Sequence, residues 1–323
     1  MNRRSILHIV ASLCVAGSMP AGAQGFPDKP VRVIVPFAPG GSTDIVARIT
    51  AQRLSERLRT QVVIDNRGGG GGNIGSDLVA KAPPDGHTLL VGTVGSLTIN
   101  PSLYKRMPYD PLKDLTPIAY YGSTPNILVV HPSLPVKSVR ELISFARSKP
   151  GQLNYASAGA GGSVHLAAEL FKSMAQVNMI HVPYKGAGPA LIDLLGGHTQ
   201  LMFSTMPPAL PFVVGSRLRA LGVTGARRSP LIPDLPTIAE SGLRGYEITQ
   251  WWGLLGPAGM SSAMVARLNS EMNAILQQPD VKERFGAEGA EPAPNTSQWF
   301  ASFMKSETAK WATVVKASGA TAD

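Results

Sequence analysis

Two glycine-rich stretches of this chain combine residue types that suit anion binding. The first, residues 36–44, reads Pro-Phe-Ala-Pro-Gly-Gly-Ser-Thr-Asp and lies between a predicted strand, 31–35, and a predicted helix, 43–58. A glycine pair lets the backbone turn tightly, and Ser, Thr and Asp are common at helix starts. Free N–H groups at the positive end of the helix dipole should then face outward. Such a group of donors favours a carboxylate.

The second stretch, residues 159–167, repeats the pattern of the first. Residues 161–163 match 40–42 at an offset of 121, and two more matches follow in the same order. Residues 62–68 are echoed by 180–186, and 86–88 by 197–199. An ordered repeat predicts two lobes of related topology, each with a glycine-rich helix start. A chance similarity between two β-α-β-α-β units is the alternative.

Several polar side chains follow predicted strands, where ligands of open α/β sheets collect. These candidates are Thr93, Ser96, His165, Lys185 and Ser204. Each has a structural alternative: turn or helix capping for the hydroxyls, packing or solvation for His165, and plain surface exposure for Lys185. The adjacent Trp251 and Trp252 lie on a predicted strand and should point to opposite faces. One could therefore face a cleft while the other packs in the core, unless both are core residues.

The N-terminus has the features of an export signal. Two arginines precede an apolar run over residues 6–19, and Ala21-Gly22-Ala23 fits the small-residue pattern of a cleavage site. We expect cleavage after Ala23, so that residues 1–23 are a signal peptide and the mature protein is periplasmic. Both the general and the twin-arginine export routes stay open. The only cysteine, Cys14, lies in the signal, so the mature chain should hold no disulfide.

The charge balance favours small anionic ligands. Removal of the signal leaves 28 Lys and Arg against 21 acidic residues, a net charge of about +7. No block of like charges occurs and aromatic residues make up only 6%, which argues against a nucleic-acid partner. The sequence predicts no metal site and no cofactor.

Motifs of enzyme chemistry are missing from the sequence. Residues 70–75 satisfy the G-x-G-x-x-G dinucleotide pattern, but no acidic residue follows the strand 88–92, so a rim loop is preferred. Phosphate-loop, zinc-peptidase, C-x-x-C and G-x-S-x-G signatures do not occur. We therefore expect binding without catalysis.

Two other functions remain alternatives. An exported hydrolase of anionic esters would need Ser42 or Ser163 as its nucleophile, yet His165, two residues after Ser163 on a helix, does not face it. The third possibility is a receptor that presents its liganded form to a membrane sensor. Sequence does not separate that role from transport, because both use the same closed lobes.

The combination of several motifs resembles one receptor family. These motifs are residues 26–37, the Pro-Gly-Gly-Ser-Thr-Asp turn, and the segments 63–67, 72–75, 183–186 and 235–237. They look like the substrate-binding proteins of tripartite tricarboxylate transporters, the Bug (Bordetella uptake gene) receptors. The likeness covers essentially the whole mature chain.

The resemblance implies an α/β fold of the two-lobed periplasmic binding protein type (type II-like, Venus flytrap). Each lobe would be a mainly parallel sheet flanked by helices, with the ligand cleft between them. We expect lobe 1 to comprise residues 24–122 plus 234–323, and lobe 2 residues 123–233. A di- or tricarboxylate, or an aromatic carboxylate, would be captured by a monomer and delivered to a permease with one large and one small membrane subunit.

Carried over by position, the resemblance also implies the ligand-binding residues. In lobe 1 these are Phe37, Ala38, Pro39, Gly40, Gly41, Ser42, Thr43, Asp44, Thr93 and Ser96. In lobe 2 they are Ser157, Ala158, Gly159, Gly161, Gly162, Ser163, His165, Lys185 and Ser204, with Trp251 or Trp252 at the hinge side. Some family members carry aspartate where Ser204 stands, which implies that this chain favours a plain or aromatic carboxylate over an ammonium-bearing ligand such as an amino acid.

Overall fold

The computed structural model describes residues 26–184 and 186–322. The predicted signal peptide, its cleavage site and Lys185 lie outside these residues. The elements follow one another as β1 (Val31–Val35), α1 (Ser42–Leu58), β2 (Val62–Asn66), η1 (Gly70–Gly72), α2 (Asn73–Ala80), β3 (Thr88–Thr93), η2 (Gly95–Ile99), α3 (Asn100–Leu103), β4 (Leu115–Val130), α4 (Val139–Ser148), β5 (Asn154–Ser157), α5 (Ser163–Ala175), β6 (Ile180–Pro183), α6 (Ala187–Leu195), β7 (Leu201–Thr205), α7 (Met206–Val214), β8 (Arg219–Val223), β9 (Thr249–Pro257), α8 (Ser262–Leu276), α9 (Pro279–Ala287), β10 (Glu291–Pro292) and α10 (Ser297–Ser318).

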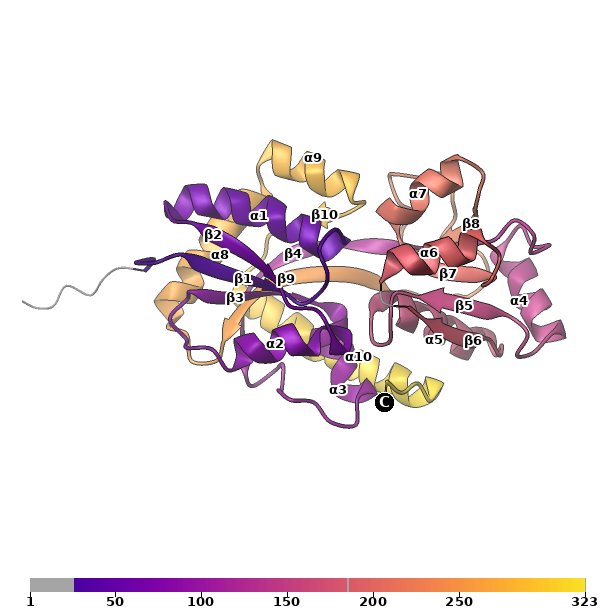
Figure 1. The fold of residues 1–323 in the computed structure, drawn as a ribbon, viewed down its shortest axis with the longest axis horizontal. Helices are drawn as coiled ribbons and strands as arrows, with labels where there is room; N and C mark the ends of the chain where they lie inside the picture. The colour runs from indigo at the N-terminus through magenta and orange to yellow at the C-terminus, as the bar shows by residue number, and fades with distance from the viewer. Residues whose placement is uncertain (1–25, 185, 323) are drawn as a thin grey trace, which may run out of the picture.

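Lobe 1 is built on a sheet with the strand order β2-β1-β3-β9-β4. The strand β1 is parallel to β2 and β3, whereas β9 is antiparallel to β3 and β4, and the short β10 pairs with β4. Helices α1, α8 and α9 pack on one face of this sheet and α2, α3 and α10 on the other (Figure 1). Because both faces are covered, β1 and β3 are almost continuously apolar.

Lobe 2 repeats this arrangement on a smaller scale. Its strands lie in the order β8-β4-β7-β5-β6, with β5 parallel to β6 and β7 and with β4 antiparallel to β7 and β8. Helices α4 and α5 cover one face, and α6 and α7 the other. The two-lobed α/β fold therefore agrees with the sequence-based expectation. The sheets are mixed rather than mainly parallel, because the strands that join the lobes run against their neighbours.

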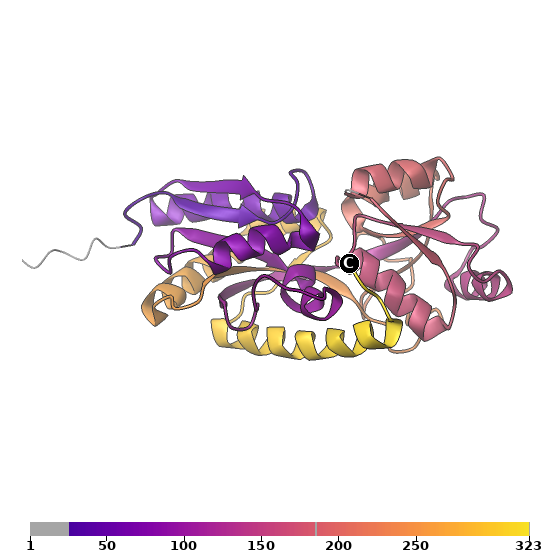
Figure 2. The same cartoon turned by 60° about the horizontal axis from the view of Figure 1, so that its bottom comes forward.

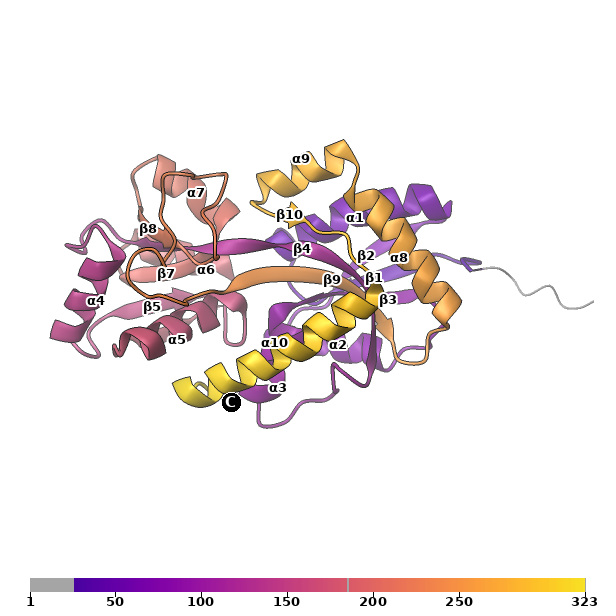
Figure 3. The ribbon, with the colours of Figure 1, turned by 180° about the vertical axis from the view of Figure 1, so that it is seen from behind.

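One long strand joins the lobes. The sequence predicts two short strands, near Ile118 and over 127–131, but β4 is continuous over 16 residues. It pairs with β9 as far as Pro125 and with β7 and β8 from Asn126 onward. Two register shifts opposite β9, after Pro117 and after Tyr120, absorb the irregularity that prolines and glycine bring to a strand. Figure 3 shows β4 and β9 crossing side by side from one lobe to the other.

The C-terminal helix α10 lies along the lower surface of lobe 1 and reaches lobe 2 (Figure 2). It packs against η2, α3 and β4, and it also contacts α5. Its buried side chains include Phe300, Trp311 and Val315. None of the described helices is long and apolar enough to span a membrane. The predicted lobe boundaries at 122/123 and 233/234 stay predictions.

Substitution of Gly122 by alanine should destabilise lobe 1. Gly122 has a φ of +144°, and a Cβ atom there would collide with the carbonyl oxygen of Glu291 in β10. We expect the free energy of unfolding, measured with urea, to fall by about 2–4 kcal/mol. Gly286→Ala in α9 is the control, since its Cβ would meet no atom within 4 Å. Equal stabilities for the two variants would contradict the role of Gly122.

Candidate anion site at two glycine turns

The two glycine-rich turns have nearly the same backbone conformation. Gly40 and Gly161 have φ values of +85° and +87°. The next residues, Gly41 and Gly162, are the N-caps of α1 and α5, with φ and ψ of −84° and 164° in the first turn and −86° and 167° in the second. Positive φ values of this size favour glycine. The sequence repeat is therefore also a structural repeat.

Each turn presents the start of a helix without a side-chain cap. The first helical hydrogen bonds join the amide of residue 45 to Gly41 (3.0 Å) and that of residue 166 to Gly162 (3.1 Å). The amides of residues 42–44 and 163–165 thus have no partner within their own helices. A Cβ atom on Gly41 or Gly162 would meet nothing within 4 Å, so the space beside both glycines is open. This geometry suits an oxyanion at each helix start.

The glycines of η1 connect the two turns. A Cβ atom at Gly72 would lie 3.2 Å from Cζ of Phe37 in the first turn. One at Gly71 would lie 3.2 Å from the carbonyl oxygen of Ala160 in the second turn. Gly71 and Gly72 thus allow close packing of η1 against both turns.

The start of η2 also touches the second turn. A Cβ atom at Gly95 would lie 2.6 Å from the carbonyl oxygen of Gly161, so only glycine fits there. The side chain of Asn100 donates to the carbonyl of Gly71 (3.1 Å) and to Oδ1 of Asn73 (2.8 Å). It also lies against Gly161. Sequence reasoning missed Asn100, whose partners Gly71 and Asn73 are 29 and 27 residues away along the chain.

The buried side chain of Asp44 stabilises the first turn through hydrogen bonds. Its carboxylate accepts hydrogen bonds from the amide of Gly40 (3.0 Å), from Nε of Arg48 (2.9 Å) and from Nδ2 of Asn66 (2.9 Å). Burial alone would raise the pKa of Asp44, but these hydrogen bonds outweigh it and lower the pKa below its usual value. Asn66 also donates to the carbonyl of Phe37 (3.0 Å). The carboxylate is therefore engaged by the protein itself.

The other side chains of the first turn contact lobe 1. Oγ1 of Thr43 accepts from Nε1 of Trp252 (3.1 Å), so Trp252 rather than Trp251 reaches this turn. Trp251 is fully buried in the aromatic cluster against α10. Burial raises the pKa of Glu288, and a hydrogen bond with Ser42 opposes that rise. Ala38 and Pro39 are exposed, as are both glycines of the turn.

The second turn is held by hydroxyl and imidazole groups. Oγ of Ser157 accepts from the amide of Gly159 (3.2 Å) and is hydrogen-bonded to Nε2 of His181 (2.6 Å). Nδ1 of His165 accepts from the amide of Gly161 (3.3 Å). Burial lowers the pKa of His165 to about 3 and that of His181 to about 4. Both imidazoles are therefore neutral near pH 7.

Three predicted hydroxyl donors are buried at strand ends. Ser96 and Ser204 are fully buried, and their Oγ atoms have no hydrogen-bond partner among the described residues. Thr93, at the end of β3, is 2% exposed. The side-chain amide of Asn126, where β4 changes partners, is likewise buried and unpaired. Buried polar groups of this kind are normally satisfied by water or a ligand.

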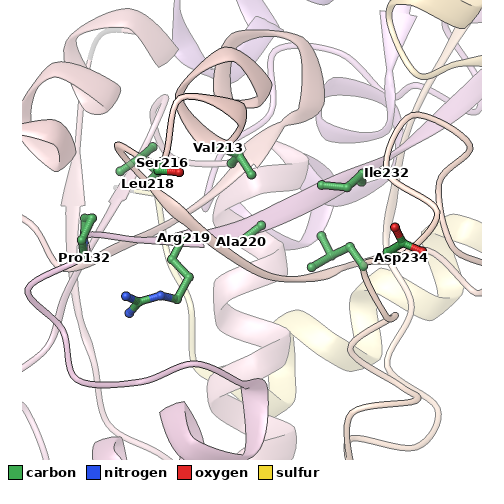
Figure 4. Close-up of a pocket in the computed structure, with 9 residues that line it drawn as sticks. Pro132, Val213, Ser216, Leu218, Arg219, Ala220, Ile232 and Asp234 are labelled. Carbon is green, nitrogen blue, oxygen red and sulfur yellow. The ribbon is translucent and has the colours of Figure 1, made fainter.

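Two surface cavities lie away from the turns. One, of about 500 Å³, is formed by α7, β8 and residues 232–235 (Figure 4). The other, of about 600 Å³, lies between the segment 107–114 and α10. No predicted ligand-binding residue lines either cavity.

The ring of His165 is turned toward Gly161. The ring of His165 contacts the Gly161 amide through Nδ1, and no hydrogen bond of this ring to Ser163 is observed. Within residues 26–184 and 186–322, no group of three His, Cys, Asp or Glu side chains could hold a metal ion.

Comparison with known proteins identifies the family. Residues 46–320 match the model of the tripartite tricarboxylate transporter family receptor, TctC. The chain belongs to this receptor family. It is 38% identical to protein BugT of Bordetella pertussis over 325 residues, which cover 99% of each chain. The resemblance found in the sequence is confirmed.

Two solved structures are close in both sequence and fold. Rpa4515 of R. palustris with adipate has 41% identity and a TM-score of 0.86, covering 91% of this chain and 98% of that one. MatC (Rpa3494) of Rhodopseudomonas palustris with bound malate has 35% identity and a TM-score of 0.83, covering 90% and 100%. The family and these neighbours are solute-binding proteins and not enzymes, so the expectation of binding without catalysis is confirmed.

The neutral histidines predict that acid weakens the fold. Because the folded-state pKa values lie below the usual 6.5, the unfolded chain takes up protons that the folded protein does not. The stability that these two neutral histidines contribute is therefore fully present above pH 6.5 and is lost as pH falls toward 4. Each histidine contributes at most about 1.4 kcal/mol per pH unit in this window. Between pH 7 and 4.5, the free energy of unfolding measured with urea should fall less steeply with pH for His165→Asn than for the wild type. Equal pH dependences would contradict a neutral, buried His165.

Proposed function

We propose that this chain is a periplasmic receptor that captures a small dicarboxylate between its two lobes and delivers it to the membrane subunits of a tripartite tricarboxylate transporter. Membership of the family supports the receptor role. The neighbours with adipate and malate support the ligand class. Both of those ligands carry a carboxylate at each end.

The observation that carries the proposal is the pair of matched helix starts. Each offers backbone amides at the positive end of a helix dipole, and each could hold one carboxylate. The turns belong to different lobes, and Gly71 and Gly95 of lobe 1 approach the backbone of the second turn at Ala160 and Gly161. A ligand with two carboxylates would engage both lobes at once.

Hydrogen bonds of this type supply enough free energy for lobe closure. Each hydrogen bond to a charged group is worth about 1.5–3 kcal/mol. Shifting an equilibrium from 1:99 to 99:1 takes roughly 5.5 kcal/mol of preference for the closed state. Two or three bonds made only on closure suffice. The buried hydroxyls of Ser96 and Ser204 would add contacts between the two ends of the ligand.

A ligand screen tests the proposed function. The mature chain, residues 24–323, would be heated with a panel of mono-, di- and tricarboxylic acids, and mass spectrometry would check each hit for chemical change. We expect dicarboxylates to raise the melting temperature most and to be recovered unchanged. Consumption of a hit would contradict the receptor role and point to a hydrolase.

Small-angle X-ray scattering tests whether the ligands found in the screen bring the two lobes together. A dicarboxylate should reduce the radius of gyration more than a monocarboxylate of the same length, since only the former reaches both turns. Equal compaction by both would contradict binding across the lobes.

Gly95→Ala should weaken ligand binding while leaving the stability of the free protein nearly unchanged. The added Cβ would lie 2.6 Å from the Gly161 carbonyl oxygen. We therefore expect it to penalise the arrangement in which the lobes touch and to leave a separated arrangement unaffected. A penalty of about 1.4 kcal/mol lowers the ligand affinity about tenfold. Calorimetric titration should show this loss with little change in the melting temperature of the free protein. Gly286→Ala is again the control, and unchanged affinity in Gly95→Ala would contradict this closure contact.

A further inference from the structure

In both turns, the side chain four residues after the first glycine accepts a hydrogen bond from that glycine's amide, but the accepting group differs. In lobe 1 the amide of Gly40 donates to the carboxylate of Asp44, and in lobe 2 the amide of Gly161 donates to the imidazole of His165. The two acceptors stand at the same offset of 121 as the glycines themselves. One acceptor carries a negative charge and the other is neutral.

The charges around the two acceptors are also arranged differently. Asp44 is paired with Arg48 one helical turn later. At the equivalent position in lobe 2 stands Glu169, which accepts from the hydroxyl of Tyr155 and pairs with Lys172 (2.7 Å). Among residues 26–184 and 186–322, His165 thus forms no ion pair or hydrogen bond with a cation of the kind that Arg48 gives to Asp44. An anionic residue at 165 would oppose an anion at the start of α5 without compensation.

A column of stacked rings fixes the orientation of His165. Its ring stacks on His181 with centroids 4.1 Å apart, and His181 stacks on Tyr155 at 4.8 Å. The charged groups that face the column are Glu169 and Lys172 of α5. The two histidines of the column are hydrogen-bonded to both ends of the turn. His181 is hydrogen-bonded to Oγ of Ser157, which accepts from the Gly159 amide, and His165 accepts from the Gly161 amide.

Acceptance at Nδ1 also defines the tautomer. An N–H group is accepted only by a ring nitrogen without hydrogen, so the single proton of His165 is on Nε2. Protonation of Nδ1 would place two donors face to face. With the Gly161 amide bound internally, the amides of residues 163–165 remain for a ligand.

We propose that His165 is a positioning residue of the second turn, which as a neutral imidazole holds the Gly161 amide and so aims the start of α5 at the ligand. The inference rests on the proposed function insofar as that ligand is a carboxylate. His165 would act without touching the ligand, as the neutral counterpart of Asp44. Its neutrality leaves the positive end of the α5 dipole uncompensated.

Two substitutions at this position form a matched pair. Asparagine carries its amide oxygen as many bonds from the backbone as Nδ1 of histidine, so His165→Asn keeps a neutral acceptor. His165→Leu removes the acceptor, and both variants lose the ring stacking. Any effect of the lost ring on stability is therefore shared, and the difference between the variants reports the hydrogen bond to Gly161.

The affinity for adipate, measured by calorimetric titration at pH 7.5, gives the first readout. We expect His165→Leu to bind about tenfold more weakly than the wild type, with His165→Asn near the wild-type value, since one buried hydrogen bond is at stake. His131→Asn and His131→Leu, at the far end of β4 where the ring bonds Ser133, are the controls and should change nothing. Equal losses in the two position-165 variants, or no loss in either, would overturn the proposal.

Hydrogen exchange of the Gly161 amide in the ligand-free protein gives the second readout. We expect faster exchange in His165→Leu than in His165→Asn or the wild type. If the wild type binds no carboxylate of the panel, the proposed function fails while this exchange still tests the positioning role. Equal exchange rates in all three proteins would overturn that role whatever the ligand.

Discussion

In each turn the amide of the first glycine is held from inside by a side chain, while the amides at the starts of α1 and α5 have no partner in their own helices. A positive φ at Gly40 and at Gly161 reverses the chain, and the next glycine enters the helix in an extended conformation. The reversal is stable because the N–H of the first glycine is accepted by a side chain one helical turn later. Without that acceptor the glycine N–H would be left as an unpaired donor beside the helix start.

The requirement for close approach explains the glycines elsewhere. Gly71 and Gly72 belong to η1 and Gly95 to the start of η2, and each stands where a Cβ atom would press on one of the turns. Gly71 and Gly95 let backbone approach backbone of the second turn, whereas Gly72 makes room for the Phe37 ring of the first turn. A site made of backbone groups gains its specificity from distance and shape, and ligand discrimination then depends on the buried hydroxyls and amides around it.

Local patterns in the sequence predicted much of this architecture. The glycine pairs, the capping residues and the apolar strands beside them are patterns of a few neighbouring residues. The two turns, the helices α1 and α5 and the repeat could therefore be predicted from the sequence. The family resemblance then supplied the two lobes. The prediction also singled out Ser204 at the end of β7 and Ser96 after β3; in the structure Ser96 lies in η2, and both hydroxyls are buried without a hydrogen-bond partner among the described residues.

Features that depend on distant contacts were not predictable in the same way. Asp44 and His165 carry no sign that their side chains turn back to a glycine amide, because that requires Asn66 and His181 from neighbouring strands. Which tryptophan reaches Thr43 is set by the register of β9 against β3. The continuity of β4 was hidden by its prolines, whose missing N–H groups are tolerated only where the ladder shifts or changes partner.

The pairing of β4 with β9 across the junction restricts how the lobes can move. Two strands joined by a hydrogen-bonded ladder resist sliding along their length, since each step of slip would break every rung, whereas twisting and bending strain each rung only slightly. Translation of one lobe past the other is thereby suppressed, and rotation about the ribbon is left as the soft coordinate. A membrane partner in contact with both lobes would thus detect ligand binding as a change in one angle, the rotation of lobe 2 relative to lobe 1.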